Sequence, residues 1–168
     1  MKFLIGLIIG FLLIPVGAFL YFKLGMAPVS TSDGVMLFES WASHTALHAR
    51  LDREYPRTVA ISVTPDNLIA GAKIYKEHCA FCHGFEGHEQ NSAAKGMFPK
   101  PPHLFRGKGV TDDPAGETYW KVENGIRLSG MPGFKGALND QQMWQVSILL
   151  ANAHSLPPEA ETIARGKE

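Results

Sequence analysis

A run of five residues, Cys79-Ala80-Phe81-Cys82-His83, places the tightest limit on the structure of this chain. The two intervening residues put both thiols on one side of a single turn, and His83 follows the second thiol directly. The pattern C-x-x-C-H is typical of a c-type haem attachment site, where the thiols add across the haem vinyl groups and the histidine binds the iron. Cys79 and Cys82 are the only cysteines in 168 residues, which leaves none for a structural disulfide or a Cys₄ zinc site. We therefore predict one haem c, bound covalently through Cys79 and Cys82.

The N-terminal residues form a long apolar run. No charged side chain occurs from Phe3 to Phe22, and a lysine stands at each end of the run. A helix of this length covers roughly 30 Å, the thickness of the hydrocarbon core of a bilayer. We expect residues 1–23 to be an uncleaved transmembrane anchor, with a cleaved signal peptide as the alternative. Pro15 within the span would be a tolerated kink.

The charge balance argues against a nucleic-acid partner. Basic and acidic residues number 16 each, whereas nucleic-acid binding needs a strongly basic face.

The length of the chain allows one compact domain plus an extension. Because haem of this type is attached outside the cytoplasmic membrane, we expect a single-pass protein of the inner membrane. Its globular part would lie on the periplasmic side.

Apolar periodicity and capping residues predict several helices joined by loops. Residues 24–63 are expected to form a linker and an amphipathic helix that ends at Pro56. Thr64 as N-cap and Pro65 as the first helical residue predict a helix that reaches about His78. The remaining predictions are a helix over 115–123, a helix over 139–153 with Asn139 or Asp140 as its N-cap, a loop over 83–106, and a mobile tail over 157–168.

The second axial ligand of the iron decides what such a haem can do. An open position would let small molecules bind, whereas a strong protein ligand leaves little but a change of oxidation state. Met131 is the preferred candidate, because Gly130 and Gly133 let its loop approach the ring closely and Pro132 stiffens that loop. A thioether favours the ferrous state and raises the potential relative to two histidines. The alternative ligands are Met97, His88 and His103.

Other histidines and methionines have simpler interpretations. His44 and His48 stand four residues apart, but no third or fourth ligand is evident nearby, so we assign them to a helix surface. Met143 is expected in the core. His154 is expected to interact with the dipole at the end of the last helix.

Further motifs flank the C-x-x-C-H run. Gly71 and Tyr75 lie before it, and Pro102 and Leu104 lie after it. Residues 124–132, with the sequence Asn-Gly-Ile-Arg-Leu-Ser-Gly-Met-Pro, form a loop around a methionine. In this order the motifs resemble those of membrane-anchored, monohaem class I cytochromes c.

The resemblance covers residues 64–156. It implies an all-α class I cytochrome c fold wrapped around one covalent haem and preceded by a single transmembrane helix. It implies His83 and Met131 as the iron ligands. The Pro102 carbonyl would accept a hydrogen bond from the free ring nitrogen of His83, and Leu104 would lie near the same, proximal side.

Three more residues receive expected positions. By the same resemblance, Trp144 in the last helix crosses the N-terminal helix of the domain near Gly71. Trp120 and Arg127 are candidates to hydrogen-bond the haem propionates, because a buried carboxylate needs charged or N–H donors. The alternative makes Trp120 a core residue and Arg127 a surface residue.

The expected function is one-electron transfer between a quinol-oxidising complex or dehydrogenase and a terminal oxidase or reductase. The chain would be an electron carrier and not an enzyme. Its expected partners are the membrane and membrane-bound or periplasmic redox proteins, with no nucleic acid and no small-molecule substrate. The alternatives are a dedicated subunit of one respiratory or dehydrogenase complex, a haem sensor or enzyme with a displaceable sixth ligand, and a structural membrane protein whose C-x-x-C-H is accidental or binds zinc.

Overall fold

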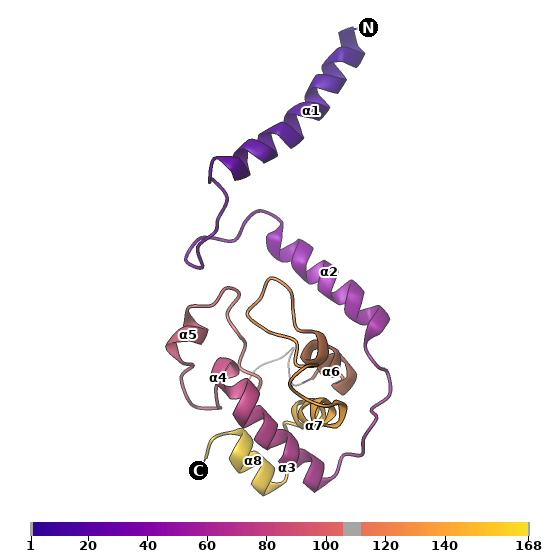
Figure 1. Cartoon of the computed structure of the whole chain (residues 1–168), viewed down its shortest axis with the longest axis vertical. Helices are drawn as coiled ribbons and strands as arrows, with labels where there is room; N and C mark the ends of the chain where they lie inside the picture. The colour runs from indigo at the N-terminus through magenta and orange to yellow at the C-terminus, as the bar shows by residue number, and fades with distance from the viewer. Residues whose placement is uncertain (1, 106–111, 168) are drawn as a thin grey trace. The chain divides into compact units, whose positions relative to one another are not determined.

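The computed structural model describes residues 2–105 and 112–167. Met1, Arg106 and Glu168, which belong to predicted segments, lie outside the described residues. Figure 1 shows helices joined by loops, and no strand occurs in these two ranges. The predicted all-α class is confirmed. The chain divides into two compact units, Met1–His44 and Thr45–Glu168.

The first unit contains α1 (Lys2–Lys23) and the beginning of α2 (Glu39–Glu54). α1 coincides with the predicted span, and Pro15 lies inside it without ending it. Its length and composition suffice to cross a membrane, and none of its residues is buried in the protein. A signal sequence near the N-terminus would share these properties.

The second unit contains a continuous helical path that leads to the C-x-x-C-H run. This path consists of α3 (Pro65–Ile74), the π-helical turn η1 (Tyr75–Cys79) and α4 (Ala80–His83). The other helices are α5 (Ser92–Lys95), α6 (Ala115–Asn124), α7 (Asp140–Ala151) and α8 (Pro158–Ala164).

The two main helix starts follow the predicted capping residues. Thr64 Oγ1 accepts a hydrogen bond from the Asn67 amide at 3.3 Å at the start of α3. At the start of α7, Asn139 Oδ1 accepts from the Gln142 amide at 2.9 Å, and Gln142 Oε1 accepts from the Asn139 amide at 2.9 Å. This reciprocal pair satisfies two amides that a helix would otherwise leave without partners.

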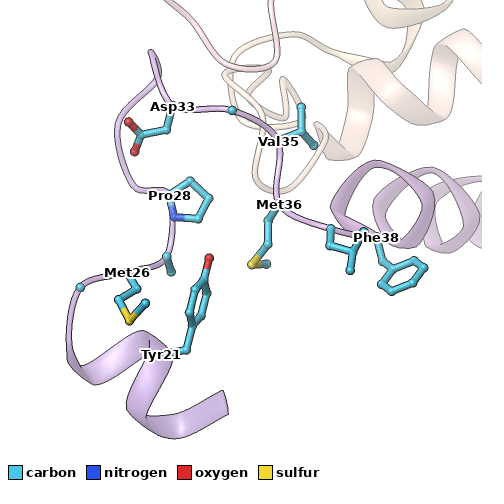
Figure 2. A pocket seen from close by; sticks show the side chains of 11 residues that line it. Tyr21, Met26, Pro28, Asp33, Val35, Met36 and Phe38 are labelled. Atoms are coloured by element: carbon cyan, nitrogen blue, oxygen red, sulfur yellow. The ribbon is translucent and has the colours of Figure 1, made fainter. Parts of the chain in front are cut away.

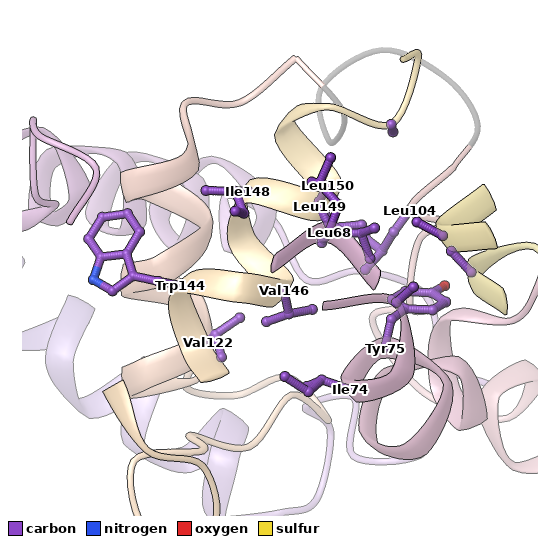
Figure 3. Close-up of a cluster of buried hydrophobic side chains, with 14 of the residues drawn as sticks. Leu68, Ile74, Tyr75, Leu104, Val122, Trp144, Val146, Ile148, Leu149 and Leu150 are labelled. Atoms are coloured by element: carbon purple, nitrogen blue, oxygen red, sulfur yellow. The ribbon is translucent and has the colours of Figure 1, made fainter. Parts of the chain in front are cut away.

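α3 and α7 pack closely against each other at Gly71. Figure 3 shows Leu68 of α3 near Leu149 of α7 in the hydrophobic core. A Cβ atom at Gly71 would lie 2.2 Å from the Gln145 carbonyl oxygen and 3.1 Å from Leu149 Cβ, so the crossing brings backbone against backbone. Trp144 instead stacks on Tyr119 of α6, with ring centroids 4.3 Å apart and an interplanar angle of 20°. This corrects the predicted position of Trp144, because Gln145 and Leu149 make the contact at Gly71.

The second half of α2 belongs to the compact unit and not to a linker. Leu51 is buried, with 1% of its surface exposed. Just after α2, the chain passes so close to α6 that a Cβ atom at Gly116 would lie 1.8 Å from the Pro56 carbonyl oxygen. The compact unit therefore begins well before residue 64, the predicted boundary.

The segment expected to be a mobile tail forms α8 instead. Proline fits the first turn of a helix, and Pro158 begins this one. Ala160, Ile163 and Ala164 are buried, and α8 packs against α3. The expectation of a mobile tail is therefore wrong for residues 158–164, because Pro157-Pro158 starts a helix as well as ending the segment before it.

Arg165 joins the end of α8 to the loop that follows His83. Its half-buried guanidinium forms ion pairs with Glu86 and Glu161, and Nη2 donates to the Ala153 carbonyl at 3.1 Å.

Arg165→Met is expected to lower the unfolding free energy by only about 1–2 kcal/mol, because both carboxylates are partly exposed and the ion pairs are partly screened by solvent. Chemical denaturation followed by circular dichroism measures the loss. Lys167→Met, which removes an exposed pair with Glu161, is the control, and an equal loss in both variants would contradict the prediction.

Candidate functional site

The C-x-x-C-H run lies where the helical path changes its winding. The π-helical turn η1 ends at Cys79, and α4 carries Cys82 and His83. π-helical turns are rare in proteins, and those that occur often lie at functional sites. Gly84 ends α4 with φ 74°, in the region that favours glycine. The path thus presents two thiols and an imidazole from one short segment.

Tyr75 ties this segment to the core. Its side chain is fully buried, and its hydroxyl donates to the Gly84 carbonyl at 2.6 Å. Burial raises the pKa of Tyr75, so the phenol keeps the proton that it donates. Its ring meets Phe105 edge to face, with centroids 4.9 Å apart. The backbone just after His83 is therefore held from inside the protein.

The orientation of His83 is set by Pro102. His83 Nδ1 lies 2.7 Å from the Pro102 carbonyl oxygen, so the expected contact is present. A carbonyl oxygen can only accept, so Nδ1 carries the proton and donates. Burial lowers the pKa of His83, which favours the neutral ring. In a neutral ring protonated at Nδ1, Nε2 keeps its lone pair for a metal.

Cys79 and Cys82 complete a donor set that fits a c-type haem. Both are half-buried and free of a disulfide. Burial, and next the neighbouring Cys82, raise the pKa of Cys79 to about 12, so the thiol is neutral at neutral pH. No group of three or more His, Cys, Asp or Glu in residues 2–105 and 112–167 is placed to hold a metal ion, as a zinc site would require.

Met131 lies in a loop between α6 and α7 that is closed by its own hydrogen bonds. The Ile126 amide donates to the Met131 carbonyl at 3.2 Å, and the Met131 amide donates to Ser129 Oγ at 3.2 Å. At the neck of the loop, a Cβ atom at Gly125 would lie 2.5 Å from the Gly133 nitrogen. Met131 itself is half-buried and packs against the hydrophobic core. Glycine is required at this neck because two backbones meet there.

Met97 lies beside the same loop. Its Sδ would be 3.0 Å from a Cβ atom at Gly130, the residue before Met131. The structure thus brings the preferred and the alternative thioether into one region. His103 lies elsewhere, beside Gly84 and next to Pro102. The role of His103 as an alternative iron ligand stays a prediction.

Gln90 and Asn91 are site residues that the sequence analysis missed. Gln90 Nε2 donates to the Cys82 carbonyl at 3.1 Å and to the Pro101 carbonyl at 2.8 Å. Asn91 Nδ2 donates to the Phe81 carbonyl. Gln90 therefore joins the C-x-x-C-H turn to the segment that carries the acceptor for His83. No spacing rule identifies such a residue, because its partners are backbone atoms far along the chain.

Gln90→Leu is expected to lower the unfolding free energy by about 1–3 kcal/mol, because two carbonyls at the site lose their donor. Thermal and chemical unfolding of the purified protein would measure the effect. Glu89→Gln next to it alters an exposed pair with Lys95 and should change the free energy by less than about 0.5 kcal/mol. If both variants unfolded alike, Gln90 would have no special role.

The remaining predicted site residues have different surroundings. Leu104 is buried in the core cluster. Trp120 Nε1 donates to Glu54 Oε2 of α2 at 3.2 Å, which differs from the predicted propionate contact. Arg127 is exposed in the loop before Met131, and its role stays a prediction. Met143 is buried, as expected.

The helical fold and the hydrogen bond that orients His83 fit a protein that binds haem through a C-x-x-C-H run. Residues 66–148 match the family model described as cytochrome c oxidase, cbb3-type, subunit III. The chain therefore carries a cytochrome c domain, and the matched residues include the C-x-x-C-H run.

Known proteins similar to this chain include a curated relative and a solved structure. The thiosulfate dehydrogenase of Stutzerimonas stutzeri (strain A1501) is 25% identical over 152 residues, which are 88% of this chain and 48% of that protein. The chain thus spans about half the length of this curated relative. The reducing HAO-like protein complex of Kuenenia stuttgartiensis contains a chain with 25% identity and a TM-score of 0.47, covering 61% of this chain and 52% of the other.

Proposed function

We propose that this chain is a membrane-tethered electron carrier that holds one haem c between His83 and Met131. It would pass single electrons between a quinol-oxidising complex or dehydrogenase and a terminal oxidase or reductase. The observation that carries the proposal is the hydrogen bond from His83 Nδ1 to the Pro102 carbonyl, because it leaves Nε2 free to bind iron.

Each residue of the site would have a separate role in holding the cofactor. When bound, the haem supplies an iron that changes between the ferrous and ferric states. Cys79 and Cys82 would fix the porphyrin to the end of the helical path, and Nε2 of His83 would donate to the iron. Pro102 keeps the proton on Nδ1, which makes the imidazole a stronger donor. Met131 would supply the opposite ligand from a loop that its own hydrogen bonds hold in shape.

The proposed anchor would serve this function because it confines the cytochrome unit to the membrane. α1 would keep the cytochrome unit close to the membrane surface, where quinol-oxidising enzymes and oxidases are found. Tethering of this kind raises the effective concentration of a carrier near its partners without any new contact. A cleaved α1 would instead give a carrier that diffuses freely.

Absorption spectra of the purified protein test the proposal. We expect a c-type α-band in the reduced form, a weak methionine-to-iron band in the oxidised form, and no spectral change when the reduced protein meets carbon monoxide at neutral pH. Rapid binding of carbon monoxide would contradict a carrier with two protein ligands. It would favour a sensor or an enzyme with a displaceable sixth ligand.

A second candidate is a dedicated cytochrome subunit of an oxidoreductase complex. It is supported by the likeness to a relative named for a dehydrogenase activity, of which the chain matches about half. Extraction from native membranes in a mild detergent separates the two proposals. A free carrier would elute alone, whereas a subunit would elute with a catalytic partner in a fixed ratio.

A further inference from the structure

The segment that follows α1 is far more apolar on its surface than a linker in water should be. We call residues 24–38 the juxtamembrane turn. Val29, Leu37 and Phe38 are 92%, 79% and 67% exposed, and Trp41 at the beginning of α2 is 68% exposed. Exposed apolar groups gathered in one short segment indicate an interaction surface, because each would gain about 1.5–3 kcal/mol on burial.

The juxtamembrane turn is folded against the end of α1 and does not trail away from it. The Leu24 amide donates to the Leu20 carbonyl at 2.9 Å, and the Met26 amide donates to the Tyr21 carbonyl at 3.1 Å. Tyr21, still within α1, and Met36 line one open hollow of about 710 Å³. Figure 2 shows the Tyr21 ring between Met26 and Met36 at this hollow. The hollow thus joins the last turn of α1 to the residues just before α2.

The charges of the turn point to apolar contact and not to attraction between opposite charges. Between Lys23 and Glu39 the only charged side chain is Asp33. Its carboxylate accepts hydrogen bonds from the Val29 and Ser30 amides at 2.9 Å each, so it closes the turn from within. The turn contains no cluster of Lys or Arg of the kind that binds anionic lipids.

We propose that the juxtamembrane turn and Trp41 insert into the interfacial layer of the bilayer, beside the end of α1. The inference rests on the proposed membrane anchoring of α1. The occupant of the apolar surface is phospholipid, because the surface is continuous with a helix that is itself exposed and apolar along its length. Tyr and Trp are the residues that prefer this layer, and apolar groups enter it to a depth of about 5–10 Å.

Insertion would change how the anchor works. A flexible linker lets a tethered domain move far from the membrane. A turn held in the interface would leave no free linker between the membrane surface and the start of α2 at Glu39. The cytochrome unit would then be confined to a thin layer at the surface, which raises its effective concentration near membrane partners further.

Single labels on the full-length haem protein test this inference. Cysteine is introduced at Val29 or Leu37, with Leu12 in α1 and the exposed Ala137 of the cytochrome unit as references. In the matured protein Cys79 and Cys82 are in thioether bonds, so an environment-sensitive fluorophore reacts with the new thiol. The protein is reconstituted into phosphatidylcholine vesicles. Quenching by brominated acyl chains is compared with quenching by iodide in the water.

We expect lipid quenching at positions 29 and 37 to exceed that at position 137 severalfold, with protection from iodide and no change in high salt. The inference is overturned if the label at position 12 is quenched by lipid while those at 29 and 37 are as open to iodide as the one at 137. The inference is also overturned, in favour of a protein partner, if the labels at 29 and 37 are protected from iodide in native membranes but not in the phosphatidylcholine vesicles. A label at position 12 that is open to iodide would show that membrane anchoring itself fails, and the inference would fail with it.

Discussion

Met131→Ala is expected to lower the midpoint potential by on the order of 0.1–0.2 V, within the range of about 0.8 V that axial ligands span. Loss of the thioether removes a ligand that favours the ferrous state and leaves a position that water or carbon monoxide can take. The weak methionine-to-iron band of the oxidised protein should disappear, and the reduced protein should bind carbon monoxide. A spectroelectrochemical titration measures both effects on one sample.

Met97→Ala is the matched control for this experiment. Met97 Sδ lies next to Gly130 and could reach the same region as Met131, so the structure leaves two thioethers to compare. We expect Met97→Ala to retain the band and to shift the potential by much less than Met131→Ala does. If the two variants exchanged their effects, Met97 would be the ligand. If neither changed the potential, neither Met131 nor Met97 would be the ligand.

Gly71→Ala is expected to cost about 3 kcal/mol of unfolding free energy or more, and to leave little folded protein at elevated temperature. The new Cβ would lie 2.2 Å from the Gln145 carbonyl oxygen, and neither neighbour is a flexible side-chain end that can move aside. α3 and α7 would have to separate, which would loosen the core on which the C-x-x-C-H run rests. Thermal unfolding followed by circular dichroism, with the haem absorption as a second probe, measures the loss.

Gly136→Ala provides the control, because a Cβ atom at Gly136 would have no heavy atom within 4 Å. It should unfold within about 0.5 kcal/mol of the unmodified protein. Similar stability of the two alanine variants would mean that α3 and α7 do not cross closely at Gly71.

The sequence predicted those parts of the fold that have local causes. Thr64 and Asn139 are capping residues whose partners lie three residues away, so the starts of α3 and α7 could be read from the chain. The contact between His83 and Pro102 was expected only through a family resemblance, because the two residues are far apart in sequence. The iron ligand opposite His83 remains a prediction for Met131.

The sequence analysis missed features that depend on tertiary packing. The π-helical turn that ends at Cys79 has no local sequence signal that distinguishes it from the rest of the helix. Pro157-Pro158 was interpreted as the end of the fold, although proline also suits the first turn of a helix such as α8. Trp120 was a candidate either for a haem propionate contact or for the core, whereas its N–H donates to Glu54, a partner in a segment that was predicted to lie outside the domain.

The intact mass of the matured protein, measured after denaturation, tests the central claim most directly. Denaturation removes any haem that is held only by coordination, so retained mass reports covalent attachment. We predict the mass of the polypeptide plus one haem, with the added mass lost when Cys79 and Cys82 are both replaced by serine. A mass that corresponds to the polypeptide alone would contradict the account.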